Sequence, residues 1–203
     1  MNKVLRETLI GAILGDAHIC KTGLNKAFIS FEQSSKKADY LNFLHDLVRK
    51  EGLPLMDETV RTYLRQDVRY NTQNSSLYFR TQSIEELRPL ADMFLDEAGA
   101  KHIPKNIAEE LTHRSLAFWI MDDGQQVKRG GVTLCTYSFD LEEVNILKEA
   151  LKLNFNLDTN IHPFALWSHA QRVGTRRLCS QKQEIKKVKT DLFMKEFIYQ
   201  KQT

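Results

Sequence analysis

Two short apolar segments with a matching pattern constrain the fold of this chain more than any other feature. They read LIGAILGDA over residues 9–17 and LAFWIMDDG over residues 116–124. Each predicts a helix that is apolar on all sides and therefore buried, and each is too short to cross a bilayer. We expect the two helices to pack on each other, because they contain small residues that would let two backbones approach closely: Gly11, Ala12, Gly15 and Ala117.

Each segment carries an aspartate at its eighth position, Asp16 in the first and Asp123 in the second. A carboxylate at a helix C-terminus is unfavourable because that end already carries partial negative charge, and two such ends side by side would repel each other. A bound divalent cation would remove the penalty, since Mg²⁺ takes carboxylate, water and phosphate oxygens as ligands. One such segment alone is typical of an ordinary core helix with a polar end. Its repetition leads to the hypothesis that Asp16 and Asp123 hold metal ions for cleavage of a phosphodiester backbone.

The second half of the chain repeats the pattern of the first. A helix is predicted over about residues 36–50, and a second helix is predicted to begin after Asp140 as its N-cap. Their apolar stripes align at an offset of 104 positions, against 107 for the two aspartates: Tyr40 with Val144, Phe43 with Leu147 and Leu47 with Leu151. Such a repeat indicates an internal duplication, which we divide into residues 1–100 and 101–203 of one compact unit.

The paired segments resemble the signature of the LAGLIDADG homing endonucleases in their monomeric, two-motif form. The second copy, followed by Gly124, is the closer match; the first has Gly15 where the family often has an acidic residue and Ala17 where it has Gly. The resemblance implies an α+β fold of two pseudo-symmetric α-β-β-α-β-β-α halves, with the motif helices packed at the centre and antiparallel sheets forming a DNA-binding saddle. It also implies a site-specific double-strand DNA endonuclease with a long, asymmetric target, acting as a monomer with the symmetry of a dimer.

The resemblance also implies the composition of the active site. Metal ions would be held by Asp16 and Asp123 together with their neighbours Gly15 and Asp122. Mg²⁺ or Mn²⁺ would support cleavage, and Ca²⁺ would substitute without supporting it. Lys101 lies in a Lys-x-Ile-Pro sequence that precedes the second motif in monomeric relatives, where the lysine assists the water or stabilises charge; the alternative is a plain linker lysine. Lys195 is nearest to the second active-site lysine of the family, one position out of register and without the usual proline.

Alternating segments predict strands whose outward faces are suited to reading DNA. Residues 27–33, 60–65 and 77–82 alternate, with one face expected in the core and the other rich in Arg, Tyr, Gln and Ser. Arg pairs with guanine, Gln with adenine and hydroxyls with either, in the major groove; the alternative is an ordinary solvated sheet face. The predicted DNA-binding residues are Ser30, Glu32, Arg61, Tyr63, Arg65, Arg69, Tyr78, Arg80, Gln82, Lys128, Arg129, Thr133, Tyr137, Arg172, Arg176 and Arg177.

The remaining predicted elements are a helix over residues 84–98, strands over residues 160–167 and 171–179, and a closing helix over residues 181–199. Net charge is only +3, but residues 171–203 hold nine Lys or Arg against three acids. This basic segment is a candidate for contacts to a nucleic-acid backbone, and a solvated helix face is the alternative.

Composition excludes several other classes of protein. No long apolar run predicts a membrane span, and three widely spaced cysteines favour neither a disulfide framework nor a zinc site. No targeting signal is recognised, so we expect an intracellular protein, in a mitochondrion or chloroplast if it is organelle-encoded and otherwise in the cytoplasm. Two alternative functions remain open on the same scaffold: a maturase that binds intron RNA, and a catalytically inactive DNA-binding relative.

Overall fold

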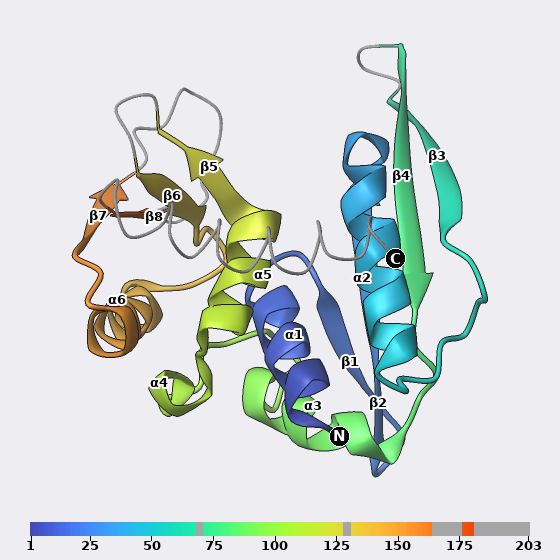
Figure 1. The fold of residues 1–203 in the computed structure, drawn as a ribbon, viewed down its shortest axis with the longest axis horizontal. Helices are drawn as coiled ribbons and strands as arrows, with labels where there is room; N and C mark the ends of the chain where they lie inside the picture. The colour runs from blue at the N-terminus through green and yellow to red at the C-terminus, as the bar shows by residue number, and fades with distance from the viewer. Residues whose placement is uncertain (68–70, 128–130, 164–175, 181–203) are drawn as a thin grey trace, which may run out of the picture. The chain divides into compact units, whose positions relative to one another are not determined.

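The computed structural model describes residues 1–67, 71–127, 131–163 and 176–180 (Figure 1). The chain forms two compact units. The first comprises Met1–Arg6 and Asp16–Leu95, and the second comprises Glu7–Gly15 and the chain from Asp96 onward. The helix α1 (Lys3–Leu14) therefore contributes to both units. The division into two pseudo-repeats at residue 100 stays a prediction.

The first unit is an antiparallel sheet with a helix on one face. The strands β1 (His18–Thr22), β2 (Lys26–Ser34), β3 (Arg61–Asp67) and β4 (Thr72–Arg80) are ordered β1-β2-β4-β3. The helix α2 (Ala38–Lys50) covers the buried face, as Figure 1 shows. Alternate residues of β2 point into this core, so Ile29 and Phe31 are buried and Phe31 stacks on Phe79 of β4 at 4.5 Å between ring centroids. The alternation predicted for residues 27–33 is confirmed.

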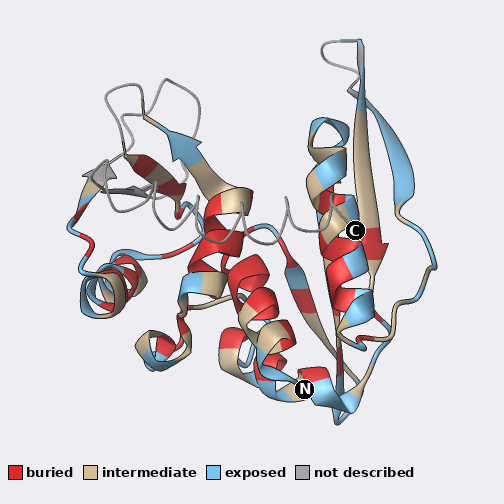
Figure 2. Cartoon of the chain, viewed as in Figure 1, coloured by how far each residue is buried: buried red, intermediate tan, exposed pale blue. Residues whose placement is uncertain are grey.

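The predicted core face of β3 is wrong. Leu64, expected inside, is 57% exposed, and Thr62 is exposed as well. β3 is the edge strand of this sheet, and among the described strands it pairs only with β4. In Figure 1 the β3–β4 ribbon runs past the end of α2, and Figure 2 shows β3 as exposed along its length. An alternating sequence therefore did not identify a buried face here, because none of the described helices covers this part of the ribbon.

The helix predicted over residues 84–98 is much shorter. A 3-10 turn at Glu85–Leu87 leads into α3 (Arg88–Phe94), with Pro89 in its first turn, and Leu95 is extended. Leu87, Leu90 and Phe94 are buried. A charge cluster joins α3 to β1: Lys21 contacts Asp92 at 3.0 Å, and Arg88 donates to both oxygens of that carboxylate. These contacts lower the pKa of Asp92 from its usual 3.8. The hydrogen bond with Lys21 contributes most to this shift of the pKa, followed by the hydrogen bond with Arg88.

The second unit repeats the strand order of the first. After the short α4 (Ile107–Glu110) and the motif helix α5 (His113–Asp123), the strands are β5 (Gly124–Gln126), β6 (Val132–Cys135), β7 (Thr159–Pro163) and β8 (Arg176–Ser180). The sheet order is β5-β6-β8-β7, the same succession of first, second, fourth and third strand as in the first unit. The α+β fold of two similar halves is thus confirmed.

Helix ends in the second unit are fixed by capping boxes. Asp140 accepts from the Glu143 backbone N–H and Glu143 accepts from that of Asp140, which begins α6 (Leu141–Phe155) where the sequence predicted. Val144, Leu147 and Leu151 of α6 are buried, and in β6 Val132 and Leu134 point inward. Within the described ranges, no helix has the length and apolar character needed to traverse a bilayer. The predicted closing helix, residues 181–199, lies outside those ranges.

Candidate active site and nucleic-acid interface

The two motif helices pack on each other within the second unit. The residues of α1 that belong to this unit include Leu9, Ile10 and Ile13, all 0% exposed, and Trp119 of α5 is also 0% exposed. Gly11 faces α5 so closely that a Cβ there would overlap the Ser115 carbonyl oxygen and lie 2.8 Å from Phe118 Cβ. The expectation that small residues let the two helices approach is confirmed at Gly11.

Contacts along this interface form a ladder with a spacing of four residues. Glu7 pairs with Arg114 at 3.6 Å. Gly11 lies against Phe118, and Gly15 lies against Asp122, where a Cβ on Gly15 would be 2.5 Å from Asp122 Cβ. All three pairs join positions that are 107 apart in the sequence, the spacing of the motif aspartates. Contacts between equivalent positions are what a twofold axis between two related helices produces.

The ladder is also chemically asymmetric. The helix α1 contributes an acid and two glycines, whereas α5 contributes a base and two larger side chains. Each small residue stands opposite a large one, and the acid stands opposite the base. The departure of the first motif at Gly15 therefore has a packing reason, because Asp122 occupies the space that a side chain at position 15 would need.

The motif aspartates directly follow this ladder. Asp16 belongs to the first unit and is exposed, and its Oδ2 accepts a hydrogen bond from Gln33 Nε2 at 2.7 Å. Gln33 is on β2, is only 7% exposed, and has the same orientation as the buried Ile29 and Phe31. The amide therefore holds the Asp16 carboxylate from the core side of the sheet. We did not predict Gln33 as a site residue, although a polar residue in the inward position of a strand is a signal that could have identified it.

Lys101 lies at the end of the first motif helix. Its ammonium donates to the Gly15 carbonyl oxygen at 2.8 Å and lies 5.8 Å from the ring centroid of Phe139. A cation at a helix C-terminus satisfies a carbonyl that has no intrahelical partner and offsets the negative end of the helix dipole. Lys101 thus offsets part of the negative charge at the end of this helix, and the Gln33 amide does the same for the Asp16 carboxylate. That negative charge was the argument for a bound metal ion.

The second motif ends with a buried and a more accessible carboxylate. Asp122 packs against Gly15 and is 9% exposed. Asp123, the last residue of α5, is half-buried. Carboxylate and backbone carbonyl oxygens are the donors that Mg²⁺, Mn²⁺ and Ca²⁺ accept, so the chemistry of these residues fits a hard divalent cation. Among the described residues, no three His, Cys, Asp or Glu side chains are grouped as a ready-made metal site.

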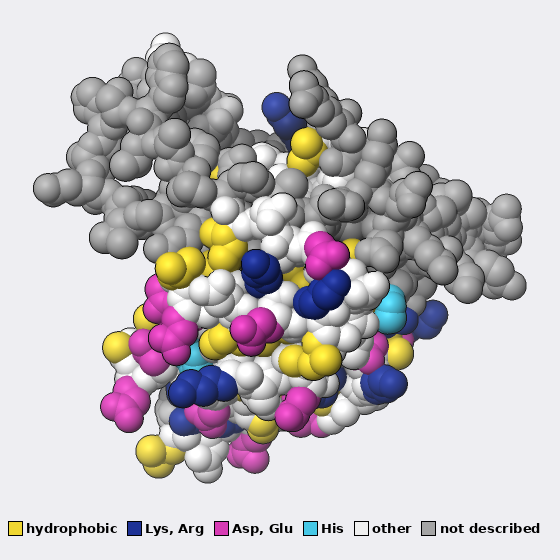
Figure 3. All heavy atoms as spheres, turned by 90° about the vertical axis from the view of Figure 1, so that its left-hand side faces the viewer, with side chains coloured by type: hydrophobic (Ala, Val, Ile, Leu, Met, Phe, Trp, Pro, Cys, Tyr) yellow, Lys and Arg dark blue, Asp and Glu magenta, His cyan; other side chains and the backbone are white. Residues whose placement is uncertain are grey.

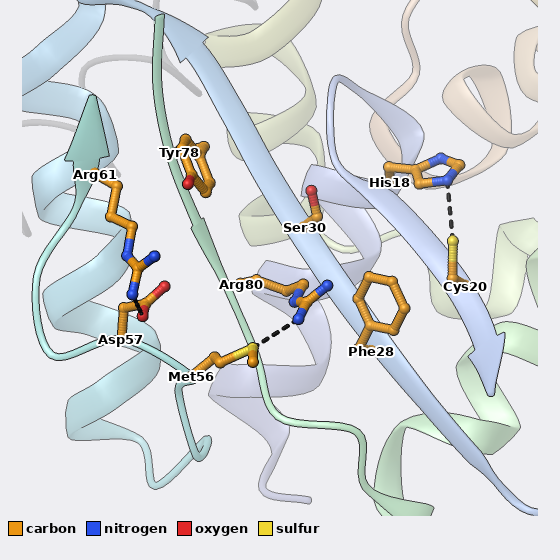
Figure 4. Close-up of a pocket in the computed structure, with 9 residues that line it drawn as sticks. All are labelled: His18, Cys20, Phe28, Ser30, Met56, Asp57, Arg61, Tyr78 and Arg80. Carbon is orange, nitrogen blue, oxygen red and sulfur yellow. Dashed lines mark hydrogen bonds and ion pairs between the residues drawn. The ribbon is translucent and has the colours of Figure 1, made fainter. Parts of the chain in front are cut away.

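The outward face of the first sheet carries the predicted DNA-binding side chains. The pairing of the strands places Arg61 beside Tyr78, Tyr63 beside Ser76, and Ser30 beside Arg80. Figure 4 shows a pocket of about 540 Å³ on this face, with side chains contributed by all four strands and by the loop before β3. Arg61 makes a salt bridge with Asp57 of that loop. The amide of Gln82 donates to the Leu55 carbonyl, so this residue also helps to hold the loop.

The predicted DNA-binding residues of the second sheet are only partly described. Thr133 is half-buried and Tyr137 is 38% exposed, consistent with their expected outward orientation. The backbones of Arg176 and Arg177 pair with β7 in the sheet. Figure 3 shows a face on which the described Lys and Arg side chains are mixed with Asp and Glu, so no single charge dominates the described part of that face. Five predicted site residues lie outside the described ranges: Arg69, Lys128, Arg129, Arg172 and Lys195.

Comparison with known proteins identifies the class that these features define. The sequence profile of the LAGLIDADG DNA endonuclease family matches residues 6–165. The chain belongs to this family.

Individual relatives agree with this assignment. The chain is 33% identical over 174 residues to the probable intron-encoded endonuclease 1 of Wickerhamomyces canadensis, covering 79% of this chain and 70% of that protein. It is 29% identical to the cytochrome b mRNA maturase bI2 of Debaryomyces hansenii, covering 80% of this chain but only 61% of the maturase. A solved structure of the homing endonuclease I-WcaI bound to its DNA recognition sequence matches with a TM-score of 0.77 and 26% identity, covering 94% of this chain and 80% of that chain.

Proposed function

We propose that the chain is a site-specific double-strand DNA endonuclease that requires a divalent cation. The observation that carries the proposal is the ladder of contacts between α1 and α5. The last contact of the ladder is Gly15 against Asp122. The residue that follows each of them in the sequence is a motif aspartate, Asp16 after Gly15 and Asp123 after Asp122. Consecutive Cα atoms are about 3.8 Å apart, so Asp16 and Asp123 each follow directly from a residue in this contact.

We assign roles within this proposal as follows. Asp16 and Asp123 would hold the metal ions, with the Gly15 carbonyl and the Asp122 carboxylate as further oxygen donors. A bound Mg²⁺ or Mn²⁺ would supply an activated water and charge stabilisation at the phosphate. The ammonium of Lys101, which lies 2.8 Å from the Gly15 carbonyl, would stabilise negative charge that develops nearby. Gln33 would orient Asp16, and Lys195 would act as the second catalytic lysine.

The partner in this proposal is double-stranded DNA. The outward residues of each sheet would contact base edges and phosphates in the major groove. Because the two halves differ in sequence, one chain would recognise a long site whose halves also differ, and would act as a monomer. The relatives named as intron-encoded and as cytochrome b maturases favour an organellar site of action.

Cleavage of a plasmid carrying the intronless form of the host gene tests the proposal. We expect double-strand cutting in Mg²⁺, and binding without cutting in Ca²⁺. Asp16→Asn and Asp123→Asn should each lower the cleavage rate by a factor on the order of 10² or more and leave binding in Ca²⁺ intact. Asp158→Asn, at an exposed carboxylate paired with Lys152, is the matched control and should cut normally. Normal cutting by both motif variants would refute the assignment of the site.

A second candidate function is that of an RNA maturase. The relatives named as cytochrome b mRNA maturases favour it. Splicing of the transcript that contains the reading frame, with and without the purified protein, tests this function. Binding to the intron transcript together with failure to bind the intronless DNA junction would favour the maturase over the endonuclease.

A further inference from the structure

The pocket on the first sheet holds an arginine whose position is fixed by its surroundings. Arg80 lies at the end of β4, and its guanidinium carbon is 4.9 Å from the ring centroid of Phe28 on β2. Its Nη2 donates to Met56 Sδ at 2.7 Å. Figure 4 shows the guanidinium between these two apolar side chains, within the pocket. A guanidinium that stacks on an aromatic ring loses less freedom when it forms paired hydrogen bonds.

The loop that carries Met56 is itself attached to β4. The Met56 N–H donates to the Arg80 carbonyl at 2.8 Å, and the Gln82 N–H donates to the Pro54 carbonyl at 2.8 Å. Leu55 also forms an isolated β-bridge with Thr81. The backbone and the side chain of Arg80 therefore both contact Met56, so the loop forms one rigid wall of the pocket.

The charges of the pocket distinguish Arg80 from its neighbour Arg61. Arg61 is paired with Asp57, whose side chain is only 15% exposed. Within the described chain, the Arg80 guanidinium contacts Phe28 and Met56, and no carboxylate pairs with it. Asp57 therefore neutralises Arg61, and Arg80 is left as the pocket arginine with no described carboxylate beside it.

We propose that Arg80 reads a guanine through paired hydrogen bonds to its major-groove acceptors, with Phe28 and Met56 holding the guanidinium in plane. This inference rests on the proposed DNA-binding function of the sheet and assigns a base to one of its side chains. Guanine presents two acceptors, O6 and N7, which match the fork of an arginine. Asp57 then has a second role, because its salt bridge keeps Arg61 from competing for the same base.

Selection of bound sequences from a DNA library measures this specificity. The probe is a pool of duplexes in which successive windows of the intron-insertion site are randomised, with Ca²⁺ present so that the DNA stays intact. We expect the wild-type chain to enrich a G·C pair at one position. Arg80→Ala should lower the preference at that position by roughly 5- to 150-fold and leave the other positions unchanged.

Two further variants separate base reading from charge. Arg80→Lys keeps the positive charge but loses the planar fork, so it should retain most of the salt dependence of binding and lose most of the guanine preference. Phe28→Leu removes the stacking surface and should weaken the same preference in part. Lys50→Ala, at an exposed lysine on the helix that covers the other face, is the control for loss of one positive charge and should leave every preference intact.

The outcomes distinguish this inference from the function on which it rests. If the wild-type chain enriches no sequence, the proposed site-specific binding fails. If it enriches a site, but Arg80→Ala weakens binding to all sequences equally and Arg80→Lys restores it, Arg80 is a phosphate contact and the inference is wrong. A lost preference for a base other than guanine would also overturn it. If Arg80→Ala unfolds at a much lower temperature than the wild type, the test rests on Arg80→Lys. Loss of the guanine preference in Arg80→Lys then supports the inference, and retention of that preference overturns it.

Discussion

Replacement of Gly11 by alanine tests the close packing of the two motif helices. A Cβ at this position would overlap the Ser115 carbonyl oxygen and lie 2.8 Å from Phe118 Cβ and 2.9 Å from the Ser115 carbonyl carbon. Carbon atoms in contact are ordinarily about 3.5–4.0 Å apart, so the helices would have to separate by roughly 1 Å. Ser115 presents backbone atoms, which cannot move aside by a change of rotamer.

The expected loss of stability follows from two opposing contributions. Overpacking in a core costs about 1–3 kcal/mol, and we expect the upper end because the obstacle is backbone. Alanine returns about 1 kcal/mol through its better helix propensity. The net destabilisation is about 2 kcal/mol, which for a chain of this size lowers the midpoint of thermal unfolding by about 4–8 °C.

Thermal denaturation followed by circular dichroism measures this change. Asn42→Ala, at an exposed position of α2, is the matched control, because it improves helix propensity without adding a contact. The control should unfold at the wild-type temperature or slightly above it. If Gly11→Ala is as stable as the control, the close approach of the two backbones does not exist and the reasoning from the ladder is refuted.

Three other predictions concern neighbouring features. Gly15→Ala should destabilise the protein because its Cβ would lie 2.5 Å from Asp122 Cβ. Asp122→Gly in the same chain removes that Cβ and should restore part of the melting temperature, whereas the backbone atoms of Ser115 allow no such repair of Gly11→Ala. Gln33→Leu should slow cleavage more than it weakens DNA binding in Ca²⁺, because it frees the Asp16 carboxylate; equal losses in both assays would contradict this role. Asp92 has a lowered pKa in the folded state, so its stabilising effect is present above pH 3.8 and declines as the pH falls through the folded pKa. The difference in melting temperature between wild type and Asp92→Asn should therefore be largest near neutral pH and shrink towards pH 3. A difference that grows in acid would mean that folding raises the pKa of Asp92 instead of lowering it.

The sequence predicted the motif helices and the buried strands because burial leaves a regular pattern. The later part of α1, residues 9–14, is apolar and buried on all sides, and the alternation in β2 follows the two faces of a covered sheet. The same reasoning was wrong for Leu64, where the alternating pattern is present but the helices in the described part of the chain leave the ribbon uncovered. It also overestimated the length of α3, which ends at Phe94, before the turn that brings Gly99 to a φ of +79°.

The contacts around the site were harder to predict because they join residues far apart in the chain. Lys101 was expected only from a family resemblance, and its hydrogen bond to the Gly15 carbonyl spans 86 positions. Gln33 reaches Asp16 at the open end of the β1–β2 hairpin, 17 positions away in the chain. Local patterns report whether a residue is buried and what element it occupies. They do not report which of several buried polar groups will meet a particular carboxylate.

The asymmetry of the ladder bears on how one chain can recognise a site with two different halves. Two copies of α1 packed in the same way would place Glu7 against Glu7, where like charges repel each other. Two copies of α5 would place Arg114 against Arg114 and force the larger side chains together. Each helix therefore complements only the other, which favours pairing of the two halves within one chain over exchange between chains. Once the halves are held as a fixed pair, each sheet is free to keep its own set of outward residues, and the pocket around Arg80 has no need of a copy in the second unit.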